Sequence, residues 1–185
     1  MKTIDTLRDE HDGVLFVLDR LARAASAAEH GIPVPKDVFA DIQEFFAIFV
    51  DKCHHGKEEA ELFPRLTTAP GRALVERLEA EHVRGRQLAA SYASAVQIYQ
   101  PGVAASGAGL AAAATDYAAF LRTHIAFETA ELFPATEALA AHDQELVDAF
   151  ERVEEERIGP GTHERLHDMI DGLEARIEPW LAAAR

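Results

Sequence analysis

Residues 54–64 read HHGKEEAELFP, and residues 124–134 read HIAFETAELFP. A shorter pattern repeats too, because residues 7–11 read LRDEH and residues 78–82 read LEAEH. His124 follows His54 by 70 residues and His82 follows His11 by 71, so the chain contains two copies of one helical hairpin. In each copy a histidine precedes a glutamate by four residues, which puts both side chains on one face of a helix.

Four long segments around these motifs have apolar side chains at steps of three and four residues, the spacing of an amphipathic helix. We expect helices over about residues 3–29, 36–63, 72–99 and 110–133. Turn-forming residues separate them at 30–35, 67–71 and 100–109. Long helices with short connections predict an all-α chain folded as an up-down-up-down four-helix bundle.

The composition favours the same class, since 35 alanines stand against 20 valines and isoleucines in 185 residues. The remaining residues contain two more helical stretches, which break at 158–161 with Thr162 as a predicted N-cap. We therefore expect a bundle domain over residues 1–135 and, over residues 136–185, a C-terminal helical extension packed on it.

Charge and cysteine content limit the partners and the compartment. The net charge of −14 disfavours nucleic acid and anionic membranes as partners. No apolar run approaches the roughly 20 residues of a membrane span, and the first residues show no apolar signal region. Cys53 is the single cysteine, so no internal disulfide forms, and we expect a cytoplasmic protein.

The repeat selects six donor groups for the bundle interior: His11, His54, Glu58, His82, His124 and Glu128. Metal binding would remove the cost of burying them. The absence of Cys-x-x-Cys argues against a structural zinc site, and the nitrogen donors argue against calcium or magnesium. Four imidazoles and two carboxylates suit two iron ions, with manganese as the alternative. If a bridging oxo or hydroxo completes the set, about two of roughly 12 octahedral positions stay open for O₂, NO or peroxide.

Taken together, the motifs over about residues 4–135 resemble the hemerythrin-like, or HHE cation-binding, domain family. The resemblance implies a four-helix bundle with a non-haem di-iron centre, in which the four histidines are terminal ligands and the two glutamates bridge. Oxygen-carrying members have a fifth histidine one turn along the third helix, where this chain has Leu78 and Arg86. This difference leaves His55, His30, Glu59 or water as the alternatives for a seventh donor.

Other polar groups are expected to have less direct roles. The repeat replaces His55 by Ile125 and Glu59 by Thr129, so we expect His55 to be solvated or to lie next to the ligands. Glu10 and Glu81 point about 100° away from the neighbouring histidines, which predicts solvation. We expect surface positions for His30 and His142, a surface or interface position for His163 and His167, and core positions for Cys53, Tyr92, Tyr99 and Tyr117. Gly85 would either leave space beside the metals or allow close helix packing.

Three functions fit this site. The favoured one is a module that binds or senses O₂ or NO, because neutral imidazoles favour ferrous ions and reversible binding. The second is a di-iron oxidoreductase that acts on peroxide, NO or ferrous iron. The third is an iron-responsive protein whose C-terminal helices meet a protein partner or a second copy of the chain.

Overall fold

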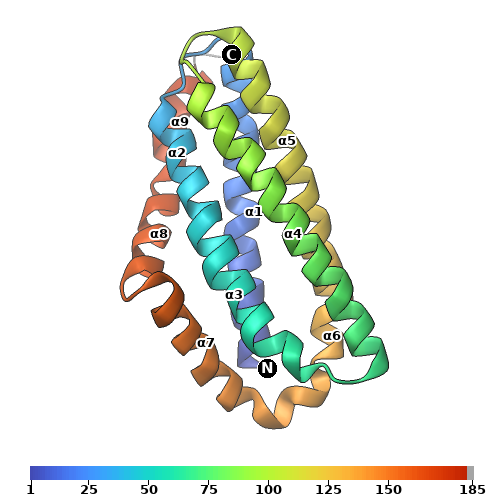
Figure 1. Ribbon diagram of the computed structural model, residues 1–185. Coiled ribbons are helices and arrows are strands. Elements are labelled where there is room, and N and C mark those ends of the chain that lie inside the picture. The colour runs from blue at the N-terminus through green and yellow to red at the C-terminus, as the bar shows by residue number, and fades with distance from the viewer. Residues whose placement is uncertain (183–185) are drawn as a thin grey trace.

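The structure is a computed structural model, and it describes residues 1–182. All regular secondary structure in that range is helical, which confirms the all-α prediction (Figure 1). Four long helical segments lie side by side, and successive segments are joined at alternate ends of the molecule (Figure 1). No helix within residues 1–182 combines the length and the apolar character that a membrane span needs.

The first and third segments are uninterrupted helices, α1 (Lys2–Glu29) and α4 (Ala69–Ile98). The second contains α2 (Lys36–Phe45), the π-helical η1 (Phe46–His54), α3 (His55–Lys57) and the π-helical η2 (Glu58–Leu62). The fourth consists of α5 (Ala104–Phe127) and the π-helical η4 (Glu128–Leu132). Each copy of the repeat thus places a candidate bridging glutamate at the start of a five-residue π-helical stretch, a feature common at functional sites.

Two predicted helix starts lie too late in the sequence. The third helix begins at Ala69, because Pro70 fits a first helical turn and the Thr68 hydroxyl accepts a hydrogen bond from the Gly71 amide. The fourth begins at Ala104, within a stretch of small residues that we expected to be a loop. Gly107 is required there, since a Cβ atom would lie 2.0 Å from the carbonyl oxygen of Ala28.

Short helical turns lie between the longer elements: η3 (Phe63–Arg65), α6 (Phe133–Ala135) and η5 (Glu137–His142). Where we expected two C-terminal helices, the part up to residue 182 contains three, namely α7 (Asp143–Ile158), α8 (Thr162–Asp171) and α9 (Leu173–Ala182). Thr162 is not an N-cap, because its hydroxyl donates to the carbonyl oxygen of Ile158. Helix α7 packs on η1, α3, η2 and α1, and α9 packs on α1 and α2, so these helices cover the first hairpin.

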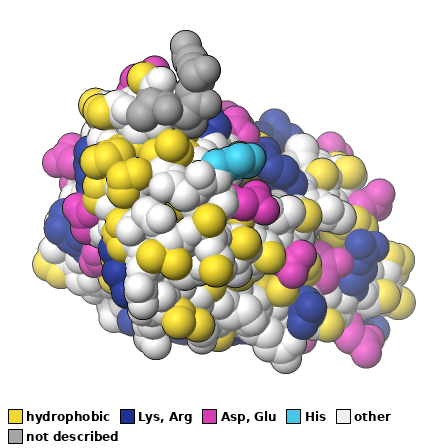
Figure 2. Space-filling model, turned by 90° about the horizontal axis from the view of Figure 1, so that it is seen from above, with side chains coloured by type: hydrophobic (Ala, Val, Ile, Leu, Met, Phe, Trp, Pro, Cys, Tyr) yellow, Lys and Arg dark blue, Asp and Glu magenta, His cyan; other side chains and the backbone are white. Residues whose placement is uncertain are grey.

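The buried apolar side chains form two clusters at different heights in the bundle. The larger cluster contains residues from Val14 onward in α1 and includes Tyr92, Tyr99 and Tyr117, as expected. The smaller cluster contains Ile4 and Leu7, with partners near the ends of the other long segments. The histidines and glutamates of the repeat lie between these clusters as a polar layer. At the end of the bundle that lies uppermost in Figure 1, the surface mixes apolar and charged side chains and shows little histidine (Figure 2).

Candidate metal centre

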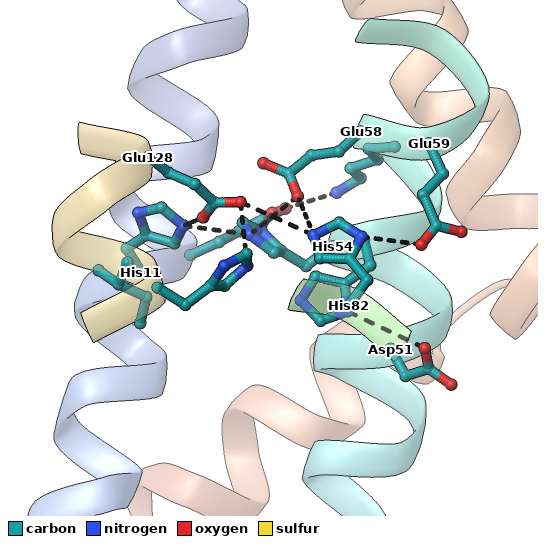
Figure 3. Close-up of polar contacts among 12 residues, drawn as sticks. His11, Asp51, His54, Glu58, Glu59, His82 and Glu128 are labelled. Carbon is teal, nitrogen blue, oxygen red and sulfur yellow. Dashed lines mark hydrogen bonds and ion pairs between the residues drawn. The ribbon is translucent and has the colours of Figure 1, made fainter. Parts of the chain in front are cut away.

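The structure brings the six repeated donors together in the polar layer. They come from every long segment: His11 from α1, His54 and Glu58 from the second segment, His82 from α4, and His124 and Glu128 from the fourth. None of the six residues is more than 3% exposed. Figure 3 shows the labelled side chains of His11, His54, His82, Glu58 and Glu128 converging on the space between the helices.

The donors fall into two groups joined by Glu128. His11 Nε2 lies 3.1 Å from His54 Nε2 and 3.1 Å from Glu128 Oε2. The other oxygen, Glu128 Oε1, lies 3.0 Å from His124 Nε2 and 3.7 Å from His82 Nε2. Glu58 Oε2 lies 3.4 Å from His82 Nε2 and 3.9 Å from His54 Nε2. Both glutamates therefore lie between the two groups of histidines, with at least one histidine nitrogen from each group within 4 Å.

Unpartnered polar atoms show that this donor set fits metal ions. Within residues 1–182, both carboxylate oxygens of Glu58 and of Glu128 are buried without a hydrogen-bond partner, as is Nε2 of His82 and of His124. Such groups are costly unless a cation occupies the space between them. Two imidazole nitrogens about 2.1 Å from one ion, at right angles, would be about 3 Å apart, which matches the His11–His54 separation. The residues present fit a pair of transition-metal ions.

His55 is buried in the same layer and lies next to His82, so of the two expected placements the solvated one is wrong and the one beside the candidate ligands is confirmed. It is 4% exposed, and its ring stacks on that of His82 with the ring centroids 3.9 Å apart. One nitrogen from each of His55, His82 and His124 lies within 4.8 Å of the others. Burial lowers the pKa of His55 to about 3, so the ring is neutral and able to bind a metal at physiological pH.

The other two side chains considered for a seventh donor, Glu59 and His30, do not lie where a ligand is needed. Glu59 Oε1 accepts hydrogen bonds from His82 Nδ1 at 2.8 Å and from Arg86 at 2.7 Å, so Glu59 supports a histidine from behind. His30 is exposed, as expected, and its Nδ1 donates to the carbonyl oxygen of Ser26. Of the three side chains, only His55 joins the donor cluster.

The prediction that Glu10 and Glu81 are solvated is wrong for Glu10, which is buried, and is confirmed only in part for Glu81, whose side chain is 22% exposed. Each of them meets a histidine of the partner helix in its hairpin. His54 Nδ1 donates to Glu10 Oε2 at 2.7 Å, and His124 Nδ1 donates to Glu81 Oε2 at 2.8 Å. A histidine that donates from Nδ1 leaves its Nε2 free for a metal, and the carboxylate raises its basicity. The sequence signal for this role was present, since a glutamate precedes the histidine in both copies of the short motif.

Charge around Glu10 is balanced by a buried lysine. Lys57 Nζ lies 2.5 Å from Glu10 Oε1 and 3.0 Å from Glu154 Oε2. Burial alone would raise the pKa of Glu10, but the hydrogen bond from His54 and the charge of Lys57 lower it to about 2. Glu10 is consequently a carboxylate throughout the physiological pH range.

The remaining histidines and the cysteine lie outside the donor cluster. His163 and His167 are partly buried and pack their rings against Phe49, while His142 is exposed as expected. Cys53 is buried as expected, and burial raises the pKa of its thiol to about 12. The thiol is therefore protonated and unreactive.

Comparison with known protein families identifies the bundle. A family model described as the hemerythrin HHE cation-binding domain matches residues 2–136. The chain belongs to this family. A comparison of the chain with curated proteins and with solved structures found no match. The hemerythrin match contains all six repeated donors and ends before α7, so α7, α8 and α9 lie outside the range that the family model describes.

Proposed function

We propose that this member of the hemerythrin family holds two iron ions and binds or senses a small diatomic ligand, O₂ or NO. The four long segments, in up-down-up-down order as Figure 1 supports, bring the ligands together. His11 and His54 hold one ion, His82 and His124 hold the other, and Glu58 and Glu128 bridge the two. The observation that carries this proposal is the set of buried, unpartnered carboxylate oxygens between the two histidine groups.

His55 completes the set as a fifth histidine on the side of His82 and His124. Its nitrogen lies with theirs, and its neutral ring needs no counter-charge. It stands in for the histidine that position 78 or 86 of α4 does not provide, since these residues are leucine and arginine. The resulting centre has three histidines on one side and two on the other.

Bound ferrous ions would supply the electrons for ligand binding, and the chain supplies the environment. Glu10, Glu59 and Glu81 fix the orientation of His54, His82 and His124 through their Nδ1 atoms. The apolar clusters above and below the layer limit the access of water to the ions. Manganese is the other metal that this donor set suits.

A cavity beside His55 offers a small ligand a route to the centre. It has a volume of about 220 Å³ and lies between η1, α4 and α5. Its lining includes His55 and Arg86 at the polar end and Phe46, Ala89 and Tyr117 along its apolar wall. Gly85 also lines it, and a Cβ atom there would lie 3.2 Å from the Phe120 ring, so this glycine serves both space and close packing.

The same cavity favours an oxidoreductase acting on peroxide, NO or ferrous iron as the second candidate function. Its volume exceeds the roughly 30 Å³ share of one water molecule several-fold, so it can admit peroxide together with water. A sensor and an enzyme differ in turnover, which an experiment can measure directly.

The test is metal analysis of the purified chain, followed by exposure of the anaerobically reduced protein to O₂, NO or peroxide. We expect about two iron ions per chain and a stable adduct with O₂ or NO in the visible spectrum. Peroxide consumption over many turnovers would favour the oxidoreductase. A chain that binds no iron after growth in iron-rich medium would contradict both functions. His142→Ala is the matched control, because His142 is exposed and lies outside the cluster.

A further inference from the structure

Helix α7 lies outside the hemerythrin match, yet one of its side chains reaches the surroundings of the metal centre. The helix packs across η1, α3 and η2, the elements that carry His54 and Glu58. Val153 contacts this surface closely, since a Cβ atom at Gly56 would lie 3.4 Å from its Cγ1 atom. The next residue, Glu154, extends to the buried ammonium group of Lys57.

Three polar contacts connect Glu154 to His54. Glu154 Oε2 accepts a hydrogen bond from Lys57 Nζ at 3.0 Å, and Lys57 Nζ donates to Glu10 Oε1 at 2.5 Å. The second oxygen of Glu10 accepts from His54 Nδ1 at 2.7 Å. The side chain of Lys57 is 2% exposed, that of Glu10 is 5% exposed and that of Glu154 is 28% exposed. This chain of contacts therefore begins near the surface, at Glu154 of α7, and ends at Nδ1 of the candidate ligand His54.

Charge balance explains what Glu154 adds. Without Glu154, the single positive charge of Lys57 would be balanced by Glu10 alone, and less negative charge would remain to act on His54. Because Glu154 shares in neutralising the Lys57 ammonium group, more of the negative charge of Glu10 acts on the His54 ring. A carboxylate that accepts from a metal-ligating histidine raises the basicity of the histidine and fixes its orientation.

Among residues 1–182, the second hairpin has no comparable contact. Glu81 is held by Arg77, whose side chain is 53% exposed and which lies four residues earlier on the same helix. That pair is local to α4 and depends on no residue beyond the hemerythrin range.

We propose that the C-terminal extension is part of the metal centre, with Glu154 as a positioning residue that acts through Lys57 and Glu10 on His54. This role rests on the proposed function for its metal, and it assigns α7 to the ion held by the first hairpin. The ion held by His82 and His124 is independent of Glu154.

The test compares Glu154→Ala with Glu155→Ala, an exposed glutamate one residue along the same helix. In the iron-loaded full chain, release of iron to a strong chelator is followed with time. We expect Glu154→Ala to release one of the two ions about 10-fold faster and the other at the wild-type rate. Glu154→Asp should restore part of the difference, and Glu155→Ala should behave as wild type.

A second measurement does not depend on metal. In the metal-free chain, the proton on His54 Nδ1 is observed by NMR, and its resonance should move in Glu154→Ala but not in Glu155→Ala. Unchanged iron release and an unchanged resonance would overturn the proposal. Equal acceleration of both ions with a lowered melting temperature would also overturn it, because the role of Glu154 would then be structural only. A wild-type chain without iron would contradict the proposed function instead, and the His54 resonance would still decide the link to Glu154.

Discussion

The two hairpins carry the same candidate ligands in different surroundings. Each provides two histidines and one glutamate, and in each a carboxylate of the first helix accepts from a histidine of the second. In the first hairpin this carboxylate is Glu10, which is buried and held by Lys57. In the second it is Glu81, which is partly exposed and held by Arg77 at the surface. The duplicated parts are those that we propose to hold the ions, whereas the parts that differ would control how firmly each candidate ligand is fixed.

Two further differences between the hairpins also concern polar groups that the first hairpin provides and the second lacks. The first hairpin provides His55 and Glu59, where the second has Ile125 and Thr129. Glu59 supports His82 across the bundle, whereas the Thr129 hydroxyl donates to a carbonyl oxygen of its own helix. A nearly symmetric sequence repeat thus gives the two proposed metal positions chemically unequal surroundings.

The largest expected effect comes from removing what both hairpins share. Glu128 contacts His11 on one side and His82 and His124 on the other, so Glu128→Ala should reduce iron to less than half of the wild-type content. His124→Ala should also lower iron well below two per chain. Both are measured by metal analysis of purified protein beside His142→Ala. Full iron content in Glu128→Ala would show that the glutamate does not bridge the two positions.

A smaller effect is expected when the supporting glutamate of each hairpin is replaced, and its size should differ between the two hairpins. Glu10→Gln leaves Lys57 without one of its buried counter-charges, and such a loss costs up to about 3–5 kcal/mol of stability. It should also weaken iron binding by about 10- to 100-fold. Glu81→Gln should have a much weaker effect on both, because the pair with Arg77 is exposed to solvent. Chelator competition and thermal unfolding provide the two measurements, and equal effects in the two variants would contradict the asymmetry.

The smallest expected effect concerns His55, which His55→Ile converts to the residue at the equivalent position of the second hairpin. The folded chain keeps His55 neutral down to a pKa of about 3, whereas in the unfolded chain the ring is protonated below its usual pKa of 6.5. The free energy of unfolding should therefore decrease as the pH falls from 6.5 toward 3, by at most about 1.4 kcal/mol per pH unit from this group. Urea unfolding of the metal-free proteins at pH 7 and pH 5 should show a weaker pH dependence in His55→Ile. An identical dependence would mean that His55 is not buried as a neutral ring.

The repeat made the six donors predictable from sequence, because a residue that recurs at the same position of a duplicated hairpin is under the same structural demand. It could not predict His55, because the second hairpin has Ile125 at the equivalent position and the repeat gives no signal there. His55 directly follows the π-helical η1, which ends at His54, and both side chains are buried. The placement of Glu10 and Glu81 depends on the partner helix and is a tertiary property.

The polar layer also has a consequence for folding. It separates a large apolar cluster from a small one, so few direct apolar contacts join the two parts of the interior. Ions bound in that layer would crosslink two cooperative folding units and stabilise them together. Amide hydrogen exchange should show this directly, with metal removal loosening the smaller unit, around Leu7 and Leu78, well before the larger one.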